Sequence, residues 1–398
     1  MFEIALTAAL MFPAKPEPVL TFATYNVCKT SCGTGRFAWD RRKAATVRNI
    51  LSARPDVLAL QEADNSYWFY ATELGKHGYA RLIPDEDNCR GTCVPDSQLF
   101  YRTAVVTPVV TDVRSDPRPA ACEAFPVEGP LEPEYPQLPP EPGWQADPQE
   151  WQRWYELRDQ LAAQYEAAYE AYLSAVRAYL DAGCPDYTDW QPLRPAGSAS
   201  QSLAAWGTSA LAASVQDRNL TWGLFRDRRT GGAFMAVSIH LPNEKSPKAE
   251  KYRKHLARTV TPQLQQWREK VGAPSLPTVL MGDLNSFAYR QPRGAHWILG
   301  KQGFRDAYSA ARKVNGDVTT VNTSATTRNP FPPRPRRSKN PTRIDYVLVD
   351  QGKALRYEVH LRLKGARFDN RYRGSDHNLV MAELKLSKVG LPGSFRDR

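Results

Sequence analysis

Short apolar runs that end in polar or acidic side chains recur along this chain and constrain its fold more than any other feature. The clearest example is Val279–Asn285, in which an apolar segment behind Pro277 ends in Gly282, Asp283 and Asn285. Apolar runs of this length are typical of buried strands. One such end is equally typical of an ordinary Asp/Asn turn, so its significance comes from repetition along the chain.

The same pattern predicts strands over 19–27, 56–60, 98–106, 220–226, 234–240, 345–349, 359–363 and 379–384. Apolar residues at spacings of three and four predict helices over 41–52, 149–182, 249–271, 295–299 and 304–313. Strands and helices therefore alternate through most of the chain.

The ends of the expected strands supply a set of polar side chains with related chemistry. They are Asn26, Glu62, His240, Asp283, Asn285, Asp345, Asp376 and His377. Hard oxygen donors in this number suit Mg²⁺ or Mn²⁺. The two histidines suit proton transfer or stabilisation of a charged phosphoryl transition state. No phosphate-binding loop or G-x-S-x-G elbow is present, and Ser375 beside Asp376-His377 does not by itself make a catalytic triad.

The charge of the chain is unevenly distributed. The formal net charge is +11 over 398 residues, yet the segment 115–205 carries 15 Asp/Glu against 5 Lys/Arg. The rest of the chain therefore carries a net charge of +21. A body this basic favours an anionic partner, such as nucleic acid or a phosphate-rich surface.

Six cysteines bear on the cellular compartment: Cys28, Cys32, Cys89, Cys93, Cys122 and Cys184. An even number with two close pairs favours disulfides, with Cys122–Cys184 as the expected long pair, although four of the thiolates could instead bind zinc. Residues 1–18 contain a short apolar stretch without a basic start, and they are interpreted as a signal remnant. No transmembrane run is present. We expect a secreted or extracytoplasmic monomer.

The acidic segment 115–205 interrupts the expected catalytic domain, which spans 19–387 and is followed by a tail at 388–398. The segment begins Pro-rich and continues into the helix expected over 149–182. Trp151, Trp154 and further aromatic residues form a stripe on that helix. Such a stripe either packs on its own protein or binds a partner.

The motifs together resemble the endonuclease/exonuclease/phosphatase superfamily, which includes deoxyribonuclease I-like enzymes. The matching elements are Tyr25-Asn26, Leu60-Gln61-Glu62, Ser238-Ile239-His240-Leu241, Gly282-Asp283-Leu284-Asn285, Arg343-Ile344-Asp345-Tyr346-Val347 and Gly374-Ser375-Asp376-His377. They occur in the family's order. The resemblance implies a four-layer α/β (α+β) sandwich, with two packed mixed β-sheets flanked by helices and interrupted by the Pro-rich and helical insertion.

The resemblance also implies a role for each site residue. Glu62 would be the main Mg²⁺ ligand, helped by Asn26 and Asp376. Asp283 would orient or deprotonate the attacking water, and Asn285 would hold a phosphate oxygen. His377, supported by Asp345, would stabilise the pentacovalent phosphorus or move a proton, and His240 would protonate the leaving group. Further phosphate contacts are expected from Tyr101, Arg102, Arg218 and Arg337.

Two departures from family patterns narrow the expected activity. Some nuclease branches carry an acidic residue at the position of Cys28, and the exonuclease III branch lacks the equivalent of His240. Both disfavour an abasic-site repair enzyme. The expectation is a divalent-metal-dependent phosphodiesterase acting on nucleic acid, with DNA as the favoured substrate. The alternatives are a phosphoesterase acting on a phospholipid headgroup or inositol phosphate, and a toxin-like module whose insertion recruits a protein partner.

Overall fold

The computed structural model describes residues 19–63, 66–82, 96–111, 147–181, 196–198, 220–243, 246–270, 272–288, 291, 293–322, 331–391 and 395–397. The chain divides into two compact units, residues 1–111 with 193–398 and residues 112–192. Each unit is described by itself. In the second unit, which lies within the expected insertion, the described part is the helix α3 (Pro148–Asp181) and the residue before it.

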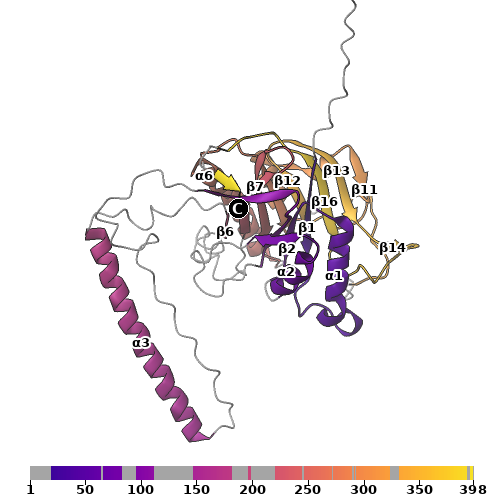
Figure 1. Cartoon of the computed structure of the whole chain (residues 1–398). Coiled ribbons are helices and arrows are strands. Elements are labelled where there is room, and N and C mark those ends of the chain that lie inside the picture. The colour runs from indigo at the N-terminus through magenta and orange to yellow at the C-terminus, as the bar shows by residue number, and fades with distance from the viewer. Residues whose placement is uncertain are drawn as a thin grey trace, which may run out of the picture. The chain divides into compact units, whose positions relative to one another are not determined.

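Two large mixed sheets form the first unit (Figure 1). Sheet A contains, in spatial order, β11 (Arg312–Val314), β13 (Lys353–His360), β16 (Leu379–Lys385), β1 (Leu20–Asn26), β2 (Val57–Gln61), β4 (Gln98–Arg102) and β3 (Tyr79–Leu82). Sheet B contains β10 (Arg305–Asp306), β12 (Asp345–Val349), β9 (Thr278–Asp283), β8 (Ala233–His240), β7 (Leu220–Asp227), β5 (Val106–Thr111) and β17 (Phe395–Asp397), and β6 (Ala196–Ser198) also pairs with β7.

Helices and short turns complete the unit. They are η1 (Gly35–Phe37), α1 (Trp39–Ala53), α2 (Tyr67–Gly75), α6 (Pro247–Lys270), α7 (Ala295–Lys301), η4 (Ala307–Ser309) and the small hairpin of β14 (Leu363–Lys364) and β15 (Arg367–Phe368). Within the described ranges, no helix combines the length and the apolar character needed to cross a bilayer.

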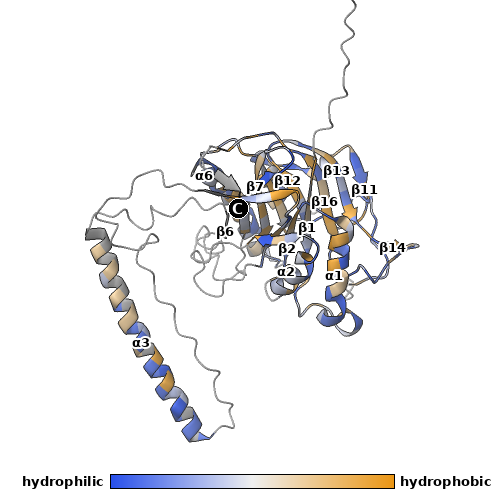
Figure 2. Ribbon diagram, in the orientation of Figure 1, coloured by the Kyte–Doolittle hydropathy of each residue, from blue (hydrophilic) through white to orange (hydrophobic). Residues whose placement is uncertain are grey.

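Alternating side chains on the strands create three apolar layers. Phe22 of β1 and Phe234 of β8 point between the two sheets. On the other face of sheet A, Tyr25 packs with residues of α1 and α2, such as Ile50 and Tyr70. Sheet B is covered in the same way by α6 and α7. Figure 2 shows hydrophobic and hydrophilic residues side by side along α1, as expected for a helix with one buried face. The predicted four-layer sandwich is therefore confirmed.

Some sequence-based expectations about local structure were wrong. Residues 304–313 are not a helix, because Arg305–Asp306 pairs with β12 and Arg312–Val314 pairs with β13. A helix this short is marginal in water, so pairing with two sheet edges outweighs its spacing pattern. The strand expected over 98–106 is two strands, β4 and β5. Part of the expected tail is β17, which pairs with β5.

We expect Phe22→Ala to destabilise the fold by about 3–5 kcal/mol, because it removes a large ring from the layer between the sheets. Phe22 is 0% exposed and packs edge-on against Phe234 at 5.5 Å between ring centroids. Urea unfolding would measure the loss. Leu363→Ala is the control, since Leu363 is 38% exposed and should change stability by no more than about 0.5 kcal/mol. A similar small loss for Phe22→Ala would contradict the layer assignment.

Candidate active site

The strands that carry the polar side chains meet at one edge of the sandwich. In sheet A, β1 and β2 are parallel, so Asn26 lies opposite Gln61 and next to Glu62. In sheet B, β8 and β9 are parallel and His240 lies opposite Asp283. Because β12 is antiparallel to β9, its first residue, Asp345, also lies opposite Asp283. This topology brings residues from distant parts of the chain together.

The carboxylate of Asp283 is the centre of the group. Its Oδ2 accepts a hydrogen bond from Nδ2 of Asn26 at 3.2 Å, across the two sheets. The same oxygen lies 3.7 Å from Nε2 of His240 and 3.9 Å from Nε2 of His377. Two imidazoles therefore converge on one carboxylate that is only 1% exposed.

Burial raises the pKa of Asp283 above its ordinary value, and the negative charge of Asp345 raises it further. The neighbouring histidines oppose this shift only in part. A carboxylate with a raised pKa is a stronger base than an exposed one, so it can accept a proton more readily.

His377 is held by Asp345. Its Nδ1 lies 3.0 Å from both carboxylate oxygens of Asp345, which leaves Nε2 directed toward Asp283. Burial alone would lower the pKa of His377, but the charge and hydrogen bond of Asp345, with the charges of Asp376 and Asp283, raise it well above the ordinary value. These neighbouring carboxylates therefore favour the protonated, positively charged ring.

His240 has an equivalent partner, Asp96, that sequence reasoning missed. Nδ1 of His240 lies 2.6 Å from Oδ2 of Asp96, and the other carboxylate oxygen accepts the Glu62 N–H at 2.6 Å. Asp96 lies just before β4, which is antiparallel to β2 with Gln98 opposite Leu60. The start of an antiparallel strand lies at the same edge as the end of its neighbour. An acidic residue before the strand was therefore the signal that could have identified it.

A turn after β1 orients Asn26 and Glu62 through its backbone. The N–H of Cys28 donates to Oδ1 of Asn26 at 2.9 Å, and the N–H of Lys29 donates to Oε2 of Glu62 at 3.0 Å. Burial would raise the pKa of Glu62, but the charge of His240 and the Lys29 hydrogen bond lower it overall. Glu62 is thus held as a carboxylate beside Asn26.

Asp376 lies across from this turn. Burial raises its pKa, and the negative charge of Glu62 raises it further while His377 opposes the shift. The hydroxyl of Ser375 donates to the main-chain oxygen of Asn26 at 2.6 Å and ties this loop to the end of β1. The Ser375 hydroxyl is therefore engaged in a hydrogen bond between two loops. This agrees with the absence of a serine-hydrolase motif in the sequence.

Asn285 lies two residues after Asp283 in a left-handed conformation, with φ of 45°. Its N–H donates to Oδ1 of Asp283 at 2.8 Å. Its side-chain Nδ2 donates to the main-chain oxygen of Leu241 at 2.9 Å and lies 3.3 Å from Nε2 of His240. The amide group thus lies beside the His240 imidazole at the same edge.

Arg42 of α1 is a second residue that sequence reasoning missed. Its guanidinium is buried and donates to four main-chain oxygens, those of Val27, Gly374, Cys28 and Lys29, at 2.8, 2.7, 2.5 and 2.6 Å. It therefore joins the turn that holds Asn26 to the loop that carries Asp376. No motif signals this role, because the pattern of 41–52 predicts only a helix.

Two of the expected phosphate-contacting residues, Tyr101 and Arg102, do not lie at this edge. Tyr101 lies opposite Val57 at the start of β2, whereas Glu62 follows its end, and Arg102 forms an ion pair with Asp56 at 2.9 Å. Register places both at the far end of the strand, about 15 Å away. Arg337 binds Asp317 through two hydrogen bonds of 2.7 and 2.8 Å. Arg218 lies outside the described residues.

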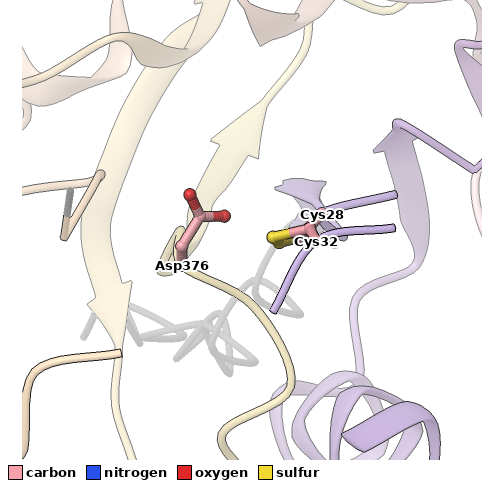
Figure 3. A group of neighbouring side chains, drawn as sticks. All are labelled: Cys28, Cys32 and Asp376. Atoms are coloured by element: carbon pink, nitrogen blue, oxygen red, sulfur yellow. A yellow bond between two sulfur atoms is a disulfide. The ribbon is translucent and has the colours of Figure 1, made fainter. Parts of the chain in front are cut away.

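Cys28 and Cys32 form a disulfide within the turn after β1. Figure 3 shows the two sulfur atoms directed toward the carboxylate of Asp376. The other expected cysteine pairs, Cys89–Cys93 and Cys122–Cys184, lie outside the described residues, as does the expected signal remnant.

The comparisons with known proteins agree on one family. A family model described as Endonuclease/Exonuclease/phosphatase family matches residues 23–169 and 184–377. The structure is similar to the endonuclease/exonuclease/phosphatase from Bacteroides vulgatus, with 17% identity, 93% of this chain and 100% of that chain covered and a TM-score of 0.53. It is also similar to a functionally unknown conserved protein from Enterococcus faecalis, with 16% identity, 92% and 100% covered and a TM-score of 0.50. At these identities the two structures show the fold alone.

A curated relative matches a short part of the sequence. Carbon catabolite repressor protein 4 homolog 1 from Arabidopsis thaliana is 37% identical over 59 residues, which is 14% of this chain and 10% of that protein. The chain therefore spans about a tenth of the length of this relative. Since the family model covers well over half of the 398 residues, the chain belongs to the endonuclease/exonuclease/phosphatase family, whose members are phosphoester hydrolases that generally depend on a divalent metal.

Proposed function

We propose that this protein is a divalent-metal-dependent phosphodiesterase that cleaves nucleic-acid phosphodiester bonds, with DNA as the favoured substrate. The observation that carries the proposal is the convergence of two histidines, each paired with an aspartate, on the buried carboxylate of Asp283. Such a group can position a water molecule, accept its proton, and donate a proton to the leaving oxygen on the opposite side of the phosphorus atom.

The metal ligands in this proposal are Asn26, Glu62 and Asp376, and the ion is Mg²⁺ or Mn²⁺. The donor set fits a hard cation, because it consists of carboxylate and amide oxygens. The negative charge of Glu62 raises the pKa of Asp376, so the two carboxylates are close enough to repel each other. A bound cation would offset that repulsion and would neutralise charge on the phosphoryl oxygens of the substrate.

The remaining residues would handle the water and the protons. Asp283 orients the attacking water and accepts its proton, which its raised pKa favours. His377, positively charged and fixed by Asp345, stabilises the charge that develops on the phosphoryl oxygens. His240, fixed by Asp96, is placed to protonate the leaving oxygen, and Asn285 beside it would contact a phosphate oxygen.

The choice of nucleic acid as substrate is supported by charge. Outside 115–205 the chain carries a net charge of +21, and Lys or Arg side chains can follow a phosphate backbone without reading its sequence. Binding should therefore weaken steeply as salt is added. The disulfide of Cys28 and Cys32 supports a location in an oxidising, extracytoplasmic compartment.

A panel of substrates tests the proposal. The protein is incubated with Mg²⁺ and, in parallel, plasmid DNA, RNA, sphingomyelin or inositol phosphates, with Asp283→Ala and His377→Ala as controls. Cleavage of plasmid DNA that both substitutions abolish is the expected result, and cleavage of RNA alone would overturn DNA as the favoured substrate. Activity confined to the lipid or to the inositol phosphates would overturn the nucleic-acid assignment and support the alternative phosphoesterase.

We expect Asp96→Asn to lower kcat by about 10-fold to 100-fold, since the neutral amide no longer stabilises a protonated His240. The amide keeps the size of the side chain and can still accept the Glu62 N–H. Steady-state hydrolysis of the cleaved substrate provides the measurement. Asp40→Asn, which breaks only the exposed ion pair with Lys43, is the control and should leave kcat unchanged. Equal kcat values for the two variants would show that Asp96 does not act through His240.

A further inference from the structure

The disulfide of Cys28 and Cys32 lies beside a carboxylate that the proposed mechanism assigns to the catalytic metal. The two sulfur atoms and a carboxylate oxygen of Asp376 all lie within 4.8 Å of one another (Figure 3). Cys28 is buried, whereas Cys32 and Asp376 are partly exposed. Solvent and small reagents can therefore approach this group from the side of Cys32.

The geometry suits a tetrahedral ion once the disulfide is opened. Bond lengths of about 2.3 Å to sulfur and about 2.0–2.2 Å to oxygen place neighbouring tetrahedral ligands about 3.5–3.8 Å apart. The Asp376 oxygen already lies within 4.8 Å of both sulfur atoms, whereas the two sulfur atoms have to move apart once the bond between them is broken. The C-x-x-x-C spacing of Cys28 and Cys32 is also within the range of zinc-binding pairs. While the disulfide is intact, neither sulfur can act as a thiolate ligand.

We propose that reduction of the Cys28–Cys32 disulfide creates a Zn²⁺ site made of the two thiolates, the Asp376 carboxylate and a water molecule. A dithiol reductant supplies two electrons and two protons, breaks the S–S bond and is itself oxidised to a disulfide. On binding the ion, the two thiols release their protons to solvent. Thiolate ligands bind Zn²⁺ in preference to Mg²⁺. The proposed site therefore prefers a different metal ion from the catalytic site, whose ligands are oxygen atoms.

Binding of zinc here would inhibit hydrolysis. Asp376 would be drawn away from Asn26 and Glu62, and the turn whose N–H groups hold those two side chains would shift with Cys28 and Lys29. The intact disulfide would thus protect the active site from zinc. This inhibition rests on the proposed function, whereas the zinc site itself does not.

Co²⁺ is the probe for the site, because its bonds to thiolates give a charge-transfer absorption. The full chain is compared as the oxidised protein, as the protein reduced with a dithiol and desalted, and as the reduced double variant Cys28→Ser/Cys32→Ser. Alkylation and mass spectrometry identify which thiols are free. We expect absorption from the reduced protein beyond that of the reduced double variant, which keeps the other four cysteines. Zn²⁺ should abolish it, and Asp376→Asn should weaken Co²⁺ affinity by about tenfold or more.

Several results would overturn the site. The disulfide could resist the dithiol in the folded protein, the two reduced proteins could give the same absorption, or Asp376→Asn could bind Co²⁺ as tightly as the reduced parent. Hydrolysis is also measured in excess Mg²⁺ with added micromolar Zn²⁺. The Zn²⁺ concentration that inhibits the reduced protein should be about tenfold lower than the concentration that inhibits the oxidised protein. Equal inhibition would overturn the protective role. A protein that hydrolyses no phosphoester would contradict the proposed function while the Co²⁺ result still decides the site.

Discussion

Replacing Asp283 by Asn is expected to lower kcat by about 10³-fold or more, the largest effect of any single change considered for this protein. The substitution keeps the volume of the side chain but removes the negative charge on which Nε2 of His240 and Nε2 of His377 converge at 3.7 and 3.9 Å. It also removes the base that would accept the proton of the attacking water. Steady-state hydrolysis in saturating Mg²⁺ measures the change.

The control for Asp283→Asn is Asp350→Asn, at a residue that lies beside Thr278, the first residue of the strand that ends at Asp283. Asp350 accepts the Thr278 N–H at 2.7 Å and the guanidinium of Arg268 at 2.5 Å, so Asp350→Asn also removes a largely buried carboxylate beside β9. We expect it to cost about 1–3 kcal/mol of stability and to leave kcat unchanged. If Asp283→Asn kept kcat and lost only stability, as expected of the control, Asp283 would be a structural carboxylate and not a catalytic one.

His377→Gln is expected to lower kcat by about 10²-fold to 10³-fold. Glutamine can still hydrogen-bond to Asp345, but it cannot carry the positive charge that the raised pKa of His377 favours. The loss should fall mainly on kcat and less on KM, because charge on the phosphoryl oxygens is greatest in the transition state. Initial rates over a range of substrate concentrations separate the two quantities.

His360→Gln is the matched control for His377→Gln. Both histidines are 8% exposed, and both pair through Nδ1 with a carboxylate, which for His360 is Glu358 at 2.8 Å. Nε2 of His360 contacts the hydroxyl of Ser52 rather than a site carboxylate. We expect a loss of stability without a loss of kcat. A decrease in kcat as large as that of His377→Gln would mean that the effect arises from disturbed packing and not from a charge at the phosphoryl group.

Local sequence patterns were sufficient to find most of the polar side chains that the structure brings together. The apolar runs ending at Asn26, His240 and Asp283 predicted both the strands and the polar residues at their ends, and the structure brings these residues to one edge. This works because a buried strand must be apolar along its length, and polar side chains become tolerable where it leaves the core. The helices α1 and α6 were predictable for the same reason, since one face of each is buried.

Partners that depend on strand register were not predictable in this way. Asp96 reaches His240 because β4 runs antiparallel to β2, and Tyr101 and Arg102 are carried away from Glu62 by that same register.

Other contacts also depend on segments that lie apart in the sequence. Arg42 lies on a helix whose pattern specifies burial but not the four carbonyl oxygens that it binds. The strands Arg305–Asp306 and Arg312–Val314 form only because two sheet edges are available.

The sequence by itself determined most of the long strands and helices, their order and the kinds of side chain at their ends, since burial and periodicity act within a few residues. Only the tertiary structure decided which of those side chains meet Asp283 and which lie at the opposite end of a strand. The physical reason is that these outcomes depend on contacts between separate segments: the register between strands such as β2 and β4, and the packing of one sheet on the other, as in the bond from Asn26 to Asp283, with a separation of 257 residues.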